Sequence, residues 1–81
     1  MKLIYEEIQE ERDRQDQKWG ERNHHPAKWL IILGEEYGEA CKHCLEAEQD
    51  NDVYYSQYRK ELIQTAAVAV AAVESLDRNN V

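Results

Sequence analysis

One stretch of this chain is apolar at every position: Ala66-Ala67-Val68-Ala69-Val70-Ala71-Ala72-Val73. Alanine favours helix, and we predict a helix from about residue 53 towards residue 76. A helix that is apolar on all sides has to be buried on all sides. Two further helices from so short a chain do not enclose it, so we expect this helix to pack inside a homo-oligomer, a dimer or a tetramer. The alternative is a two-sided helix sandwiched within one subunit.

Two more helices are expected upstream. Residues 3–18 begin with an apolar face and then become almost wholly polar, so the second half of this helix meets solvent or a polar site. Gly20 ends the first helix, and Pro26 suits the first turn of a second one. The second helix carries an apolar seam with steps of three and four residues: Leu30, Leu33, Tyr37, Ala40 and Cys44. We therefore predict a single all-α domain over residues 1–81, a three-helix subunit that completes a helical bundle through oligomerisation.

Charge and cysteine content narrow the function classes. The chain has 17 acidic and 10 basic side chains and a formal net charge of −7. Such a surface repels nucleic-acid backbones and anionic membranes, so neither is expected as a direct partner. Cys41 and Cys44 lie three apart on a predicted helix, a poor arrangement for a disulfide, which indicates reduced thiols. With no signal-peptide pattern and no apolar run long enough to span a bilayer, we expect a soluble, cytoplasmic protein.

Two pairs of polar side chains point to a metal. Glu36 and Glu39 share one face of the second helix, and two anions held that close repel each other unless a cation bridges them. Glu61 and Gln64 share a face of the third helix, and antiparallel packing brings the two pairs together. Charged oxygen ligands suit Mg²⁺ or Mn²⁺. A single Glu-x-x-Glu pair is usually only a solvated face, and the later Glu74-x-x-Asp77 is interpreted as a solvated helix end.

The order of these motifs resembles a known family. Glu35-Glu36-x-x-Glu39 is followed after 21 residues by Glu61-x-x-Gln64 at the start of an Ala/Val-rich helix. This arrangement resembles the MazG-type all-α NTP pyrophosphohydrolase superfamily. The upstream residues resemble its short MazG-like members, which are common in phage and bacteria: Gln17-Lys18-Trp19-Gly20, His24-His25 and Trp29-Leu30.

The family pattern is Glu-Glu-x-x-Glu followed by Glu-x-x-Asp. Position by position, the resemblance implies that Glu36, Glu39 and Glu61 are magnesium ligands and that Glu35 supports them. The fourth position is Gln64, which offers a carbonyl oxygen but no charge. Weaker metal affinity, fewer bound ions and lost catalysis are the possible consequences.

The resemblance also implies an activity, a magnesium-dependent hydrolysis of an NTP or dNTP to a monophosphate and pyrophosphate in a site assembled within an oligomer. The carboxylate that activates water is Glu35, Glu36 or Glu39. The candidate substrate-binding residues are four cations, one aromatic ring and one loop histidine: Lys18, Lys42, Arg59, Lys60, Trp19 and His24.

Other functions are weighed against this one. An oligomer with the family's shape and an impaired metal site would be a nucleotide- or protein-binding module, which Gln64 favours. A purely structural helical adaptor is a third possibility. A zinc site around Cys41 and Cys44 is less favoured because a continuous helix lacks the tight turn of zinc knuckles. A di-iron bundle is excluded because it needs two helical Glu-x-x-His motifs.

Overall fold

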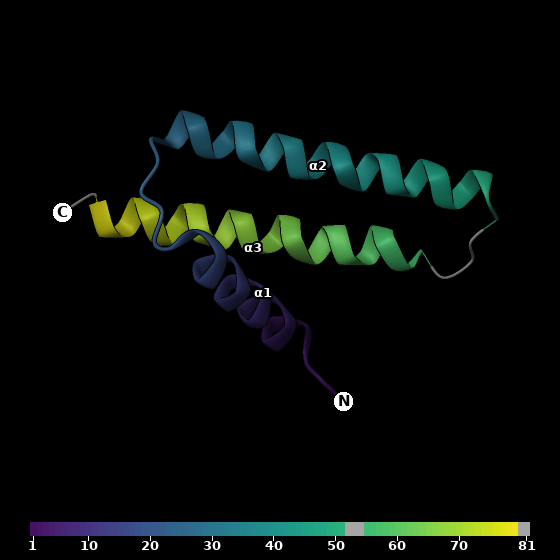
Figure 1. Ribbon diagram of the computed structural model, residues 1–81, viewed down its shortest axis with the longest axis horizontal. Coiled ribbons are helices and arrows are strands. Elements are labelled where there is room, and N and C mark those ends of the chain that lie inside the picture. The colour runs from purple at the N-terminus through teal and green to yellow at the C-terminus, as the bar shows by residue number, and fades with distance from the viewer. Residues whose placement is uncertain (52–54, 80–81) are drawn as a thin grey trace.

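The computed structural model describes residues 1–51 and 55–79, and these residues form three helices (Figure 1). They are α1 Ile4–Trp19, α2 Pro26–Gln49 and α3 Ser56–Asn79. The all-α prediction is confirmed, and the first two helices begin where the sequence places them. The expected start of the third helix, residue 53, lies outside the described residues, and that helix continues three residues past its predicted end.

Local signals set the ends of the first two helices. Gly20 has a φ of 73° and its N–H donates to the carbonyl of Asp16 at 2.8 Å, which ends α1. Pro26 opens α2, and Nδ1 of His25 accepts a hydrogen bond from the N–H of Ala27 at 3.1 Å. Both are residue types whose conformational preference acts within a few positions, so the sequence alone could place them.

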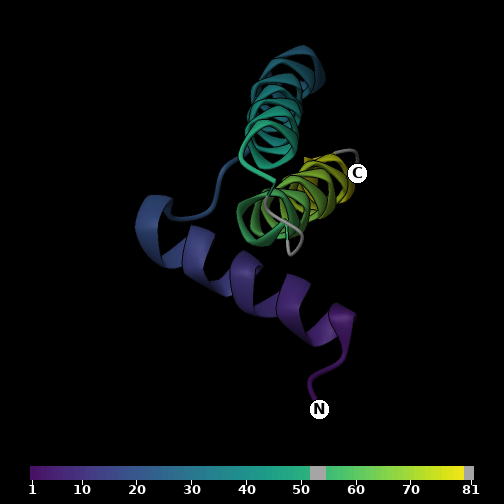
Figure 2. The same cartoon turned by 90° about the vertical axis from the view of Figure 1, so that its right-hand side faces the viewer.

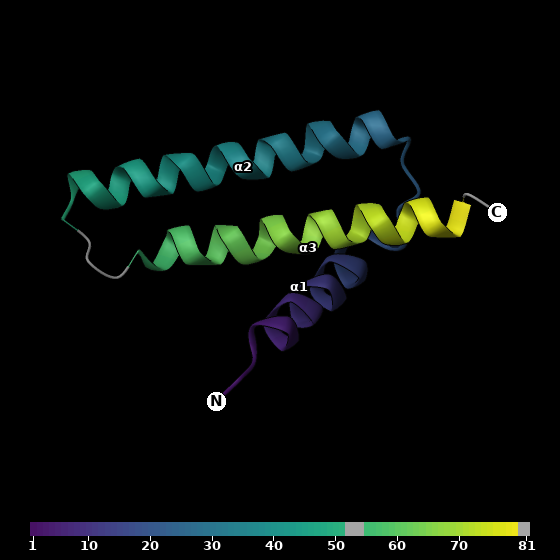
Figure 3. The same cartoon turned by 180° about the vertical axis from the view of Figure 1, so that it is seen from behind.

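The helix that carries the apolar stretch is the central one. Helix α3 runs antiparallel to α2, and α1 crosses α3 at an angle (Figures 1 and 3). The end-on view shows α3 between the other two helices (Figure 2), and in the described part of the chain α1 packs on α3 but not on α2. The core is built from Trp29, Val68 and Ala71, with Ile32, Leu33 and Ala72 packed against it.

Polar side chains join α1 to α3. Arg12 is only 5% exposed and donates through Nε to Glu74 at 2.8 Å, while Gln15 beside it is also buried. The polar half of α1 therefore makes a partly buried polar contact with α3. The side chain of Glu74 is 46% exposed, as expected for a solvated helix end, but its carboxylate also pairs with Arg12 from another helix, which the sequence did not predict.

One stripe of α3 is left uncovered by its own chain. Ala67, Val68 and Ala71 are buried, whereas Val70, Val73 and Leu76 are 39%, 57% and 50% exposed. We call these three exposed residues the uncovered stripe. The single chain thus buries one side of the apolar helix and leaves the other side to solvent.

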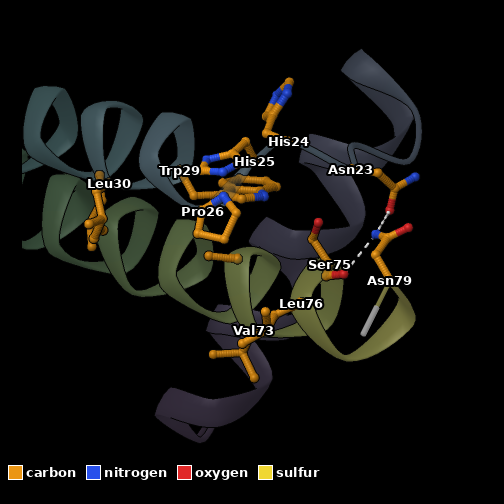
Figure 4. Close-up of a pocket in the computed structure, with 12 residues that line it drawn as sticks. Asn23, His24, His25, Pro26, Trp29, Leu30, Val73, Ser75, Leu76 and Asn79 are labelled. Carbon is orange, nitrogen blue, oxygen red and sulfur yellow. Dashed lines mark hydrogen bonds between the residues drawn. The ribbon is translucent and has the colours of Figure 1, made fainter. Parts of the chain in front are cut away.

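A hollow adjoins the uncovered stripe. Pro26, Trp29 and Leu30 of α2 face Val73 and Leu76 of α3 across a cavity of about 560 Å³ (Figure 4). At one end of this cavity, the side-chain amide of Asn79 donates to Asn23 at 2.8 Å (Figure 4). No helix in residues 1–51 or 55–79 combines the length and apolar composition needed to cross a bilayer.

Candidate active site

The antiparallel packing of α2 and α3 brings Glu36 and Glu61 together. Burial raises the pKa of Glu36 above its ordinary value, and the nearby carboxylate of Glu61 raises it further by its charge and by a shared hydrogen bond. Glu39 and Glu11 add smaller repulsive effects. A carboxyl group in such surroundings is stabilised by a proton or by a cation.

The raised pKa of Glu36 has a consequence for stability. The folded state holds the Glu36 proton more tightly than the unfolded chain, so stability falls as pH rises from about 4.5 through the raised pKa. In chelator at pH 7, Glu36→Gln is therefore expected to raise the melting temperature, with no gain near pH 4. Thermal melts followed by circular dichroism measure this.

The matched control is Glu35→Gln, which removes the same charge from the exposed neighbouring position. In this variant, the difference in melting temperature between pH 7 and pH 4 should stay close to that of the parent chain. A Glu36→Gln variant that is less stable than the parent at both pH values would contradict the repulsion.

Gln64 lies directly against Glu61. With the amide oriented so that its nitrogen faces Glu61, which is the orientation that satisfies both groups, this nitrogen donates to both carboxylate oxygens of Glu61 at 3.1 and 3.2 Å. If the amide turned over, its oxygen would stand at those same distances from the carboxylate. Neighbouring ligands of an octahedral magnesium ion, each about 2.1 Å from the metal, are separated by about 3 Å. Gln64 is therefore placed to act as a donor to Glu61 without a cation and as an oxygen ligand with one.

Glu39 stands apart from the Glu36–Glu61 pair. Its side chain is 54% exposed, and Nε2 of His43 lies 4.0 Å from Glu39 and 3.9 Å from Glu61. His43 thus lies between two of the predicted ligands. Its position one turn after Glu39 was the available sequence signal, but only the packing of α3 shows that it also reaches Glu61.

The kinds of donor group that meet here are those that suit a metal ion. No three His, Cys, Asp or Glu side chains in the described ranges are arranged as a ready-made set of metal ligands. The donors that do meet, Glu36, Glu61 and the Gln64 amide, are oxygen groups of the kind that magnesium prefers. Burial and the charge of Glu61 together raise the pKa of Glu36, and a divalent cation would relieve this repulsion between the two carboxylates.

A groove lies beside these donors, between all three helices. It has a volume of about 250 Å³. Four of its residues are predicted site residues: Trp19, Glu35, Glu36 and Gln64. The rest are Glu11, Arg14, Gln15, Arg22, Ile32 and Val68. We call this hollow the site groove.

A second hollow adjoins the site groove. It has a volume of about 350 Å³ and shares Glu11, Arg14 and Gln64 with the groove. Arg59 and Lys60, two of the predicted substrate-binding cations, line it. Arg59 is already engaged there, because it donates to both carboxylate oxygens of Glu7 at 2.9 and 2.7 Å.

The other predicted substrate-binding residues lie outside both hollows. Lys18 is placed over the ring of Trp19, with its Nζ 4.7 Å from the ring centroid. Lys42 is exposed on α2. His24 packs against Trp29, with ring centroids 5.0 Å apart, and lines the apolar cavity of Figure 4.

Two cations of the site groove were missed at the level of sequence. Arg14 lies on the polar half of α1, and its Nε donates to Glu11 at 2.8 Å. Arg22 lies in the loop between α1 and α2. The expectation that the polar half of the first helix meets a polar site was a signal for Arg14, whereas no pattern in the sequence singled out Arg22.

The chain matches no protein-family model, no curated protein and no solved structure. The motifs and the geometry of the groove therefore carry the functional proposal.

Proposed function

We propose that this chain is the subunit of a MazG-like, magnesium-dependent nucleotide pyrophosphohydrolase, which converts an NTP or dNTP to a monophosphate and pyrophosphate. The observation that carries the proposal is that Glu61 meets both Glu36 and Gln64, and that these last two side chains line a groove that also holds two arginines and Trp19. A nucleotide needs this combination: oxygen ligands for the cation that accompanies its phosphates, guanidinium groups for phosphate oxygens, and a ring for its base.

The residues have separable roles in this proposal. Glu36, Glu61 and the Gln64 oxygen would hold magnesium, and Glu39 would join them once His43 moves aside. When bound, magnesium neutralises phosphate charge and makes a coordinated water more acidic. Glu35 lines the groove and is exposed, so its carboxylate is the base that accepts the proton as water attacks the α-phosphorus and pyrophosphate leaves.

The uncovered stripe supports the homo-oligomer. Val70, Val73 and Leu76 form an apolar stripe on the central helix, and exposed Leu30 adjoins it across the cavity of Figure 4. Contiguous apolar surface of this kind marks interaction sites. A second copy of the chain packed on the stripe completes the helical bundle that the sequence predicts.

The proposed activity is tested by pyrophosphate release from a panel of NTPs and dNTPs, with magnesium, with manganese and with chelator. Metal-dependent release from at least one nucleotide is the expected result, and the preferred base then defines the substrate. A folded, oligomeric protein that releases no pyrophosphate from any member of the panel refutes the enzyme.

A second candidate function is a nucleotide-binding module without turnover. The hydrogen bonds from Gln64 to Glu61 favour it, because they occupy a carboxylate that a metal would otherwise bind. Binding of a nucleotide that requires magnesium, without release of pyrophosphate, would establish this function in place of the enzyme.

Gln64→Asp tests how far Gln64 weakens the metal site. The substitution adds a carboxylate beside Glu61 and removes the hydrogen bonds to it, so we expect magnesium to bind about tenfold more tightly. In chelator, the same added repulsion lowers the melting temperature. Calorimetric titration with MgCl₂ and thermal melts measure the two effects.

Gln49→Asp is the matched control, because it makes the same charge change at the exposed last residue of α2, ten residues and about 15 Å along the helix beyond Glu39. It should leave magnesium affinity within about twofold of the parent value, as expected for a distant surface charge. Equal gains in the two variants would mean that net charge, and not the position of Gln64, sets the affinity.

A further inference from the structure

Arg22 is held between the only two tryptophans of the sequence. Its Cζ lies 4.8 Å from the ring centroid of Trp19 and 5.0 Å from that of Trp29. The backbone beside it is also fixed, because the carbonyl of Arg22 accepts a hydrogen bond from Nη2 of Arg78 on α3 at 3.0 Å. The guanidinium therefore lies against rings from α1 and α2, while the backbone of Arg22 is bound to α3.

Among the described residues, the Arg22 guanidinium has no counter-ion of its own. Its Nη2 is buried without a hydrogen-bond acceptor, and its side chain forms no ion pair with residues in the described ranges. Burial, with help from the positive charge of Arg12, lowers the pKa of Arg22 from its ordinary value. Asp16 and Glu36 attract it only from a distance. An arginine remains charged under these conditions, so at Nη2 this cation has lost water without gaining an acceptor from the described residues.

The place of Arg22 says which anion would fit. Arg22 lines the site groove together with Glu36 and Gln64, next to the candidate cation site. The groove is small, about 250 Å³, so it admits a compact anion and not a folded partner. A planar guanidinium fork pairs with two oxygens at once, and phosphate offers them in the matching geometry.

We propose that Arg22 is an anion-binding residue that receives a phosphate group, with Trp19 and Trp29 fixing its guanidinium toward the groove. The identification of that phosphate as part of a nucleotide rests on the proposed function. The binding of a polyphosphate by Arg22 does not rest on the proposed function, because it follows from the unpaired cation and the groove alone.

The two tryptophans provide the readout, since both lie against Arg22 and the chain has no others. Inorganic tripolyphosphate is titrated into the intact protein, with and without magnesium, while tryptophan emission is followed. Wild-type protein should bind with a change in emission. Arg22→Gln should bind about 10- to 100-fold more weakly, as expected for losing charge-assisted hydrogen bonds.

Lys28→Gln is the matched control, an equal loss of charge at an exposed position of α2 close to the loop. Its affinity should stay within about twofold of the parent value. Arg22→Lys keeps the charge without the planar fork and should fall between the parent and Arg22→Gln. It supplies the test if far-UV circular dichroism shows that Arg22→Gln does not fold.

Three results would overturn the role of Arg22: no binding by the wild-type protein, unchanged binding by Arg22→Gln, or an equal loss in Lys28→Gln. Pyrophosphate release from the nucleotide panel separates this role from the proposed function. Arg22-dependent binding of tripolyphosphate without hydrolysis of any nucleotide would refute the proposed enzyme and support the anion site. Nucleotide hydrolysis with an unchanged KM in Arg22→Gln would refute the anion site and support the proposed enzyme.

Discussion

Replacing Glu61 with glutamine is expected to lower magnesium-dependent pyrophosphate release by about 100- to 1000-fold, the usual range for removing one electrostatic contact to the transition state. Glu61 is the central carboxylate of the site. It is only 15% exposed, it raises the pKa of Glu36, and it accepts both hydrogen bonds from Gln64.

The loss should come from chemistry and not from unfolding. Glutamine has nearly the same shape, and removing the charge of Glu61 relieves the repulsion at Glu36, so the melting temperature in chelator should not fall. Initial rates at saturating magnesium, together with melts, separate the two causes. Glu48→Gln, an equal charge change at an exposed position of α2, is the control and should keep full activity.

Retained activity in Glu61→Gln would remove the assigned metal site. The same assay on Glu39→Gln then decides whether Glu39 belongs to the ligand set. The resemblance predicts that this variant loses turnover with its helical content intact. His43, which lies between Glu39 and Glu61, has to move for that prediction to hold.

Val73→Asp is expected to dissociate the proposed oligomer into monomers. Val73 is the most exposed residue of the uncovered stripe, so a single chain tolerates a carboxylate there at little cost. In a symmetric assembly the charge is buried once in each copy, and an unpaired buried charge costs several kcal/mol. The dissociation constant should rise by about 1000-fold or more, which corresponds to about 4 kcal/mol.

Light scattering coupled to size-exclusion chromatography measures the mass of the assembly at several concentrations. Tyr5→Asp is the control, since Tyr5 is an exposed aromatic residue of α1 that lies outside the stripe. It should leave the mass unchanged. A parent chain that is monomeric at every concentration, or a Val73→Asp variant that keeps the parent mass, would refute the stripe as an interface.

Much of the fold could be predicted because its signals are local. Gly20 and Pro26 act on their own backbone. The apolar stretch of residues 66–73 predicts a helix whose surface has to be buried. The ion pair between Arg12 and Glu74 could not be predicted. The two residues lie 62 positions apart, and each alone resembles an ordinary surface charge.

The candidate site was predictable in part for the same reason. The pairs Glu36-x-x-Glu39 and Glu61-x-x-Gln64 have the same spacing. The antiparallel packing of two helices joined by a short linker is enough to bring Glu36 and Glu61 together. Arg22 has no such pattern. Its role depends on two rings from different helices, and their positions follow from how α1 and α2 pack on α3.

The sequence by itself therefore determined the three helices and their approximate ends, and it singled out Glu36 and Glu39 on α2 and Glu61 on α3 as candidate acidic donors. These properties depend on backbone preference and on periodicity within one helix. Only the tertiary structure decided that His43 lies between Glu39 and Glu61, that Nη2 of Arg22 is buried with no acceptor among the described residues, and which stripe of α3 stays uncovered. Distances across helices and loss of water arise only once the helices pack, so no local pattern encodes them.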